Sequence, residues 1–210
     1  MNSRSISKIV GGSYLIIFVA AVFANFVVIE ALLQSPLEAV QENNAMVRMG
    51  IVAFLLTAAL DTVIAWGLYE LYSKHPLSKL STFFRIMHAV VMGVALFALL
   101  QTLSAPSASA ILKEVETFNN IWLIGLFFFG IHLILLGRIL RKPVIIALFI
   151  ILAGIMYMVD TLAHFLLADY EKYSTVFLAL VAVPSIVGEL SLAIYLLVNN
   201  GSRTQKKVIG

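Results

Sequence analysis

Six ionisable side chains lie inside long apolar stretches of the sequence. Such groups are rare in a bilayer, and where they occur they usually serve a substrate, ion or proton site. The six are Asp61, His88, His132, Asp160, His164 and Glu189. Glu70 is set aside because it lies near the end of its stretch, where it can reach the membrane surface or pair with Lys74.

Four of these groups are predicted to lie at similar depths. With a rise of about 1.5 Å per residue, Asp61 lies within about 2 Å of the middle of its stretch. By the same measure, His132 and Glu189 lie about 4–5 Å to one side of the midplane, and Asp160 lies about 7 Å to the other. The sequence therefore predicts one polar layer across four helices, although depth leaves open whether these helices face one another.

Local spacing adds two residues to the candidate site. Asp160 and His164 are four residues apart, and Tyr157 shares their helical face. The candidate ligand- or proton-binding residues are Asp61, His132, Asp160, Glu189, Tyr157 and His164. We expect His88, which lies near Arg85 and the membrane boundary, to be structural or interfacial.

Three kinds of function are open at this point. The polar layer could bind or transport a small molecule, an ion or a proton. Asp61, His132 and Glu189 could instead hold a divalent metal that activates water in an intramembrane hydrolase, although no ligand pair has a diagnostic local spacing. The polar residues could also lock the helices in register within a structural or partner-binding protein.

Several cofactors are excluded or disfavoured. No apolar stretch contains a lysine, which excludes a retinal Schiff base. A bis-histidine haem is disfavoured because His88 and His132 differ by about 5 Å in predicted depth. The absence of cysteine excludes disulfides and thiolate metal sites, and no G-x-S-x-G motif supports a serine hydrolase.

A short repeat favours the transport hypothesis. Leu60-Asp61-Thr62-Val63 and Val159-Asp160-Thr161-Leu162 occupy the middle helices of two three-helix halves. Halves of three spans have inverted topology, as in many transporters. A chain with six spans would need to form a homodimer to build a full transport path.

The composition places these residues in a lipid bilayer. Of the 210 residues, 61% are hydrophobic and 12% are charged, against about 25% charged in soluble domains. Six stretches have the length of about 20 residues that a spanning helix needs. We predict an all-α fold with one transmembrane domain over residues 1–210, a six-helix bundle with spans at 9–29, 47–72, 83–104, 119–140, 144–167 and 174–198.

Lys and Arg in the short loops predict the orientation of this bundle. One side carries Arg4, Lys8, Lys74, Lys79, Arg85, Arg138, Arg141, Lys142, Arg203, Lys206 and Lys207. The other side carries Arg48, Lys113 and Lys172 and is rich in Asp and Glu. We therefore predict a protein of the cell membrane with both termini in the cytoplasm. The net charge of +3 gives no nucleic-acid signal, because the basic residues lie at helix ends.

Several ordered segments resemble the prokaryotic membrane family called Domain of Unknown Function 4386. They are Gly11-Gly12-Ser13-Tyr14-Leu15, Asp61 with Leu68-Tyr69-Glu70-Leu71, Gly130 to Gly137 around His132, Ala153 to Tyr157 with Asp160, and Gly188-Glu189-Leu190-Ser191-Leu192. The resemblance covers almost the whole chain. It implies a membrane protein of six or seven helices, and it carries no established activity or catalytic role.

Overall fold

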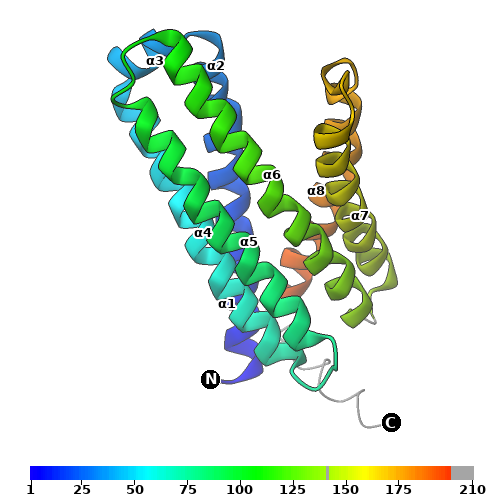
Figure 1. The fold of residues 1–210 in the computed structure, drawn as a ribbon. Helices are drawn as coiled ribbons and strands as arrows, with labels where there is room; N and C mark the ends of the chain where they lie inside the picture. Colours follow the sequence, from blue (N-terminus) through cyan, green and yellow to red (C-terminus); the bar gives the residue numbers. More distant parts are fainter. Residues whose placement is uncertain (141, 200–210) are drawn as a thin grey trace.

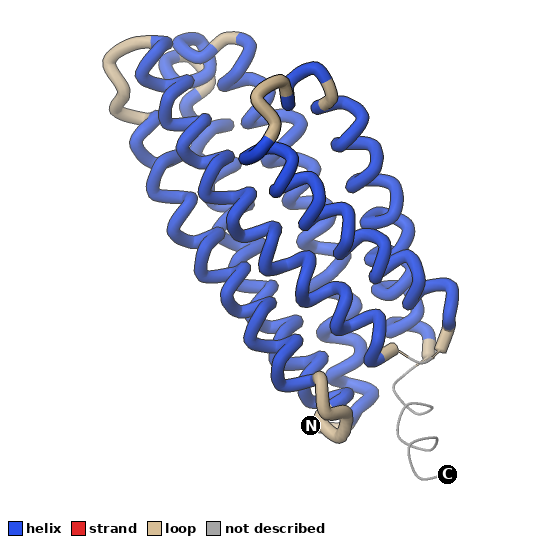
Figure 2. The backbone as a smooth tube through the Cα atoms, turned by 45° about the vertical axis from the view of Figure 1, so that its right-hand side comes forward, coloured by secondary structure: helices blue, strands red, loops and turns tan. Residues whose placement is uncertain are grey.

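The computed structural model describes residues 1–140 and 142–199, which form helices joined by short connections (Figures 1 and 2). Within this part of the chain, six helical segments are long and apolar enough to cross a membrane, which confirms the all-α fold and the six predicted spans. The first segment joins α1 (Ser3–Phe23), the π-helical η1 (Ala24–Ile29) and α2 (Glu30–Gln34). The others are α4 (Asn44–Tyr72), α5 (Ser78–Thr102), α6 (Ala108–Ile139), α7 (Val144–Leu166) and α8 (Ser174–Val198).

Several helices extend beyond the apolar stretches used for prediction. Helix α5 begins at Ser78 rather than at residue 83, and α6 begins at Ala108 rather than at residue 119. The predicted bounds mark where the apolar residues begin and end. The helices are longer, because their backbone hydrogen bonding continues into the polar residues that flank each apolar stretch. Two short elements, α3 (Pro36–Gln41) and η2 (Tyr170–Lys172), lie in connections. The basic residues predicted at 141, 203, 206 and 207 lie outside the described residues.

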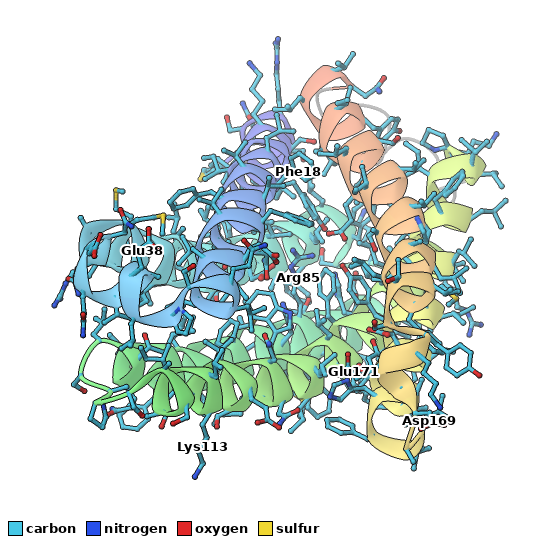
Figure 3. All side chains as sticks on the ribbon, turned by 90° about the horizontal axis from the view of Figure 1, so that it is seen from above. Phe18, Glu38, Arg85, Lys113, Asp169 and Glu171 are labelled. Carbon is cyan, nitrogen blue, oxygen red and sulfur yellow. The ribbon has the colours of Figure 1, made fainter. Side chains whose placement is uncertain are left out.

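The six long helices form a ring in chain order. Each packs against the next, and α1 closes the ring by packing against α8. We call the end that carries α2 and α3 the cap end, and the end at which α1 starts the basal end (Figure 1). Seen along the bundle, Arg85 of α5 lies in the space framed by α1, α6 and α8 (Figure 3).

Two apolar cores divide the bundle along its length. The cap core joins η1, α2, α3 and the adjacent halves of α4, α5 and α6, with Phe54, Phe118 and Trp122 packed ring against ring at centroid distances of 5.0–5.2 Å. The basal core joins α1, α4, α6, α7 and α8. Helices α7 and α8 therefore contribute to the basal core and not to the cap core.

The hairpin of α7 and α8 diverges from the other helices toward the cap end (Figure 1). No residue between 162 and 180 is buried. Nearer the base, Gly130 of α6 and Gly154 of α7 bring two backbones together, because a Cβ on either residue would stand 2.5–2.6 Å from the carbonyl oxygen of the other. Small residues at a helix crossing permit this close approach in a membrane.

Candidate functional site: a buried arginine cluster

The site begins with a buried stripe along α5. Residues at alternating spacings of three and four lie on one face of a helix. The buried residues in this register are Ser78, Ser81, Arg85, His88, Met92, Ala95, Leu99 and Thr102. The first four are polar and the next three are apolar. The polar half of the stripe thus places one cation and one imidazole inside the basal half of the bundle.

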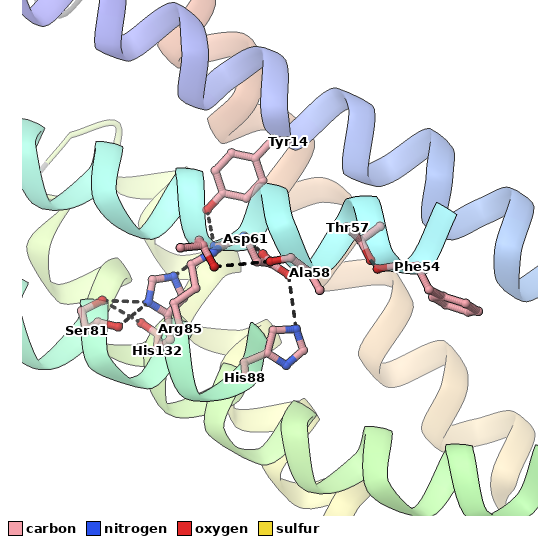
Figure 4. Close-up of polar contacts among 10 residues, drawn as sticks. Tyr14, Phe54, Thr57, Ala58, Asp61, Ser81, Arg85, His88 and His132 are labelled. Carbon is pink, nitrogen blue, oxygen red and sulfur yellow. Dashed lines mark hydrogen bonds and ion pairs between the residues drawn. The ribbon is translucent and has the colours of Figure 1, made fainter. Parts of the chain in front are cut away.

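Arg85 is the centre of the site, with only 1% of its surface exposed. Its Nη2 donates a hydrogen bond to Asp61 Oδ1 of α4 at 2.5 Å, and its Nη1 donates to the Tyr14 hydroxyl of α1 at 2.8 Å (Figure 4). The guanidinium also lies over the rings of Tyr14 and Phe129, at 4.9 and 5.2 Å from their centroids. Charge-assisted hydrogen bonds and cation–π contacts together compensate the buried charge.

His132 of α6 supplies the next contact. Arg85 Nη1 lies 3.1 Å from His132 Nε2, and since a guanidinium only donates, Nε2 must accept. The proton of a neutral imidazole then resides on Nδ1, which lies 2.9 Å from both the backbone carbonyl oxygen and the hydroxyl oxygen of Ser81. The hydrogen bonds therefore define one tautomer and one ring orientation for His132.

His88 completes the cluster on the cap side. Its Nε2 lies 3.5 Å from Asp61 Oδ2, and its ring packs 4.7 Å from that of Phe129. His88 was expected to be structural or interfacial, and its burial beside Asp61 contradicts the interfacial alternative and leaves the structural one. His88 Nδ1 and Arg85 Nε are buried without a hydrogen-bond partner in the described residues. The cluster thus retains unused hydrogen-bonding capacity.

Glu189 of α8 lies within electrostatic range of the cluster. Its carboxyl group interacts with the charges of Arg85 and Asp61, and also influences Tyr14 and Tyr157. It is half-buried, and it makes no hydrogen bond or ion pair among residues 1–140 and 142–199. Glu189 is therefore a carboxyl group within electrostatic range of a buried cation that is already paired with another carboxylate.

Asp160 belongs to a different group. Its Oδ1 accepts a 2.7 Å hydrogen bond from the Tyr170 hydroxyl of η2, and the ring of His164 packs 4.6 Å from that of Tyr170. Partial burial, together with Asp160, raises the pKa of the Tyr170 hydroxyl above its usual value. Asp160 and His164 thus tie η2 to the end of α7, whereas Asp61 and His132 meet around Arg85.

The predicted metal ligands do not form a ligand set in the described residues. No group of three His, Asp or Glu side chains in this part of the chain is arranged to hold a metal ion. Asp61 and His132 instead contact the Arg85 guanidinium, which places a positive charge where the metal would sit. The metal-dependent hydrolase stays a prediction without geometric support.

Sequence reasoning missed three residues of the cluster, and Arg85 is the most important. The assignment of Arg85 to the loop charges is wrong, because α5 begins seven residues earlier and buries this side chain. Its spacing of three from His88 and four from Ser81 was the available signal. Tyr14 and Ser81 carried no comparable signal, since isolated hydroxyl groups are common in spanning helices.

The fold and site define a multi-pass helical membrane protein with a buried ion pair in its bundle. The family described as Domain of unknown function (DUF4386) matches residues 9–199, and the chain belongs to this family. A protein of Archaeoglobus fulgidus described as "Uncharacterized protein" is 32% identical over 122 residues, covering 55% of this chain and 67% of that protein. No solved structure matches the chain.

Proposed function

We propose that this protein binds protons and transports them across the membrane, with Glu189 as the exchanging carboxyl group. The observation that carries the proposal is that Glu189 lies within electrostatic range of Arg85 and makes no hydrogen bond or ion pair in the described residues. An ionisable group within a membrane is by default a candidate for such a role. Asp61 already neutralises Arg85, so a second carboxyl group is free to gain and lose a proton.

The chemistry of the cluster favours a proton over other cargo. A metal cation at this position would be repelled by the Arg85 guanidinium, and an anionic ligand would compete with Asp61 for it. Two imidazoles, a phenol and two carboxyl groups are all groups that exchange protons. His132 and Tyr14 contact the same guanidinium nitrogen, so hydrogen-bonded groups surround the centre.

We also propose that the basal end faces the cytoplasm. Without Arg85, the described residues at the basal end still include Arg4, Lys8, Lys74, Lys79, Arg138 and Lys142. The described basic residues at the cap end are Arg48, Lys113 and Lys172, among several Asp and Glu residues. The positive-inside rule then places both ends of the chain in the cytoplasm of a cell membrane.

Proton flux into sealed vesicles tests the proposal. Protein reconstituted in liposomes with a pH-sensitive dye should take up protons when a potential is imposed, and Glu189→Gln should reduce the rate about tenfold or more. Glu70→Gln, which removes an exposed carboxyl group at the basal end of α4, is the matched control and should leave the rate unchanged. Flux equal to that of empty vesicles would overturn the proposal.

A chemical measurement tests the role of Glu189 separately. Dicyclohexylcarbodiimide is an apolar reagent that modifies protonated carboxyl groups within membranes. We expect mass spectrometry to find the modification on Glu189 and not on Asp61, because the ion pair with Arg85 keeps Asp61 ionised. Preferential modification of Asp61 would contradict the choice of Glu189 and would show that Asp61 is the carboxyl group that exchanges the proton.

A structural role is the second candidate. The cluster joins α1, α4, α5 and α6 through the contacts of one side chain, Arg85, and such a network fixes the register of four helices. The two functions are compatible, since Arg85 and Asp61 can hold the helices in register while Glu189 gains and loses a proton.

A further inference from the structure

A small cavity, lined by both polar and apolar residues, lies between the basal halves of α4, α5 and α6. Its volume is about 10 Å³, close to the smallest space that holds one water molecule. The polar residues in its wall are Tyr69, Tyr72, Ser78, Ser81, Thr82 and His132, and the apolar ones are Ala65, Leu68, Leu136 and Ile139.

The cavity extends from the basal surface toward the arginine cluster. Tyr72 ends α4, Ser78 begins α5 and Ile139 ends α6, so these three residues mark its outer limit. Ser81 and His132 mark its inner limit, and His132 contacts Arg85 directly. His132 lies seven residues before the end of α6, or about 10 Å from it at 1.5 Å per residue.

The polar groups of the cavity wall have capacity for water. His132 Nδ1 donates toward Ser81, so the Ser81 hydroxyl oxygen accepts there. Among the described residues, the acceptor for the Ser81 hydroxyl proton is the His132 carbonyl oxygen at 3.4 Å. That distance is long for a hydroxyl donor, whose hydrogen bonds are usually 2.5–3.0 Å. A water molecule in the cavity would give Ser81 a closer acceptor and meet the two to four partners that a buried water needs.

We infer that this cavity is a hydrated inlet, through which water from the basal side reaches Ser81 and His132. The inference deepens the proposed function, because water at this position connects the proton site with the solution on one side of the membrane. The inlet would be the basal part of a path that continues to Glu189.

Cysteine accessibility tests the inlet, and the chain itself contains no cysteine. Single variants Thr82→Cys and Ser78→Cys place a thiol in the cavity wall. Phe83→Cys is the matched control, because the Phe83 side chain follows Thr82 on the same helix and is 52% exposed. Each reconstituted variant is treated with 2-aminoethyl methanethiosulfonate and followed by intact mass spectrometry.

Modification requires the thiolate, which forms in water and not in hydrocarbon. We expect both cavity variants to react about tenfold faster than Phe83→Cys or more. Equal and slow reaction of all three variants would overturn the inlet. The measurement does not depend on proton flux. A dry cavity would therefore appear as slow thiol modification, whereas a Glu189 that exchanges no proton would appear as unchanged flux in Glu189→Gln.

Discussion

The two halves of α5 show how one buried helical stripe serves two purposes. Toward the cap end, Ala95 and Leu99 pack into an apolar core with the aromatic trio of α4 and α6. Toward the basal end, the same register presents Ser81, Arg85 and His88, which bind polar groups of α1, α4 and α6. The cap half derives its stability from close packing, whereas the basal half depends on satisfying a buried charge.

The largest expected effect comes from removing the cation alone. Arg85→Met leaves the buried Asp61 without its permanent cation and with His88 as its remaining neighbour, and breaking a buried pair in this way costs about 3–5 kcal/mol. The double variant Arg85→Met, Asp61→Leu removes both charges and should recover most of this loss. Thermal unfolding in detergent measures both. If the double variant is as unstable as the single one, the stability of the bundle depends on the ion pair itself and not only on the absence of an unpaired buried charge.

A substitution in the cap core tests the apolar half of the α5 stripe. Phe118→Ala removes a ring that contacts both Phe54 and Trp122, and the resulting cavity should cost about 3 kcal/mol. Proton flux in folded protein should stay unchanged, because the cap core shares no contact with Arg85. Loss of flux at full stability would mean that the two halves of the bundle are coupled.

A change within the cluster should have a smaller effect. His132→Ala removes one of the two acceptors at Arg85 Nη1 and leaves the bond to Tyr14. Loss of one such hydrogen bond to a charged group costs about 1.5–3 kcal/mol. Unfolding temperature measures this cost, and Ser81→Ala is a milder control that keeps the imidazole. If His132→Ala is neutral, the tautomer assigned to His132 contributes nothing to stability.

The smallest effect is expected outside the cluster. Tyr170→Phe removes the hydrogen bond to Asp160, at a cost of about 1 kcal/mol. We expect proton flux to remain at the level of the unmodified protein, because Asp160 belongs to the α7–η2 connection. A strong loss of flux would show that Asp160 takes part in proton transfer, as its predicted depth in the polar layer implies.

The fold followed from the sequence more completely than the site did. Hydropathy reports lipid exposure directly, so the six spanning helices were predicted correctly. Depth was also informative for Asp61 and His132, which meet around one guanidinium. Depth carries no information about rotation around the helix axis, and for that reason Asp160 was grouped with residues that it does not join.

Arg85 could not be assigned from hydropathy, because a basic residue near the end of an apolar stretch is usually a loop charge. The decisive information was the register of α5, in which Arg85 continues the line from Ser81 to His88 and Met92. A search for polar residues in heptad-like register would have found it. Tyr14 required the fold itself, since its partner lies 71 residues away in the chain.

The glycine crossing between α6 and α7 has a mechanical consequence. The α7–α8 hairpin packs closely in the basal half and has no buried residue from 162 to 180, so we expect the hairpin to tilt about the glycine crossing. Such a tilt displaces the connection between α7 and α8 more than the residues near the Gly130–Gly154 crossing. Gly188 packs against Ile150 of α7 in the basal half, and Glu189 follows it directly. A bilayer that thins or thickens is therefore expected to displace the hairpin tip more than Glu189.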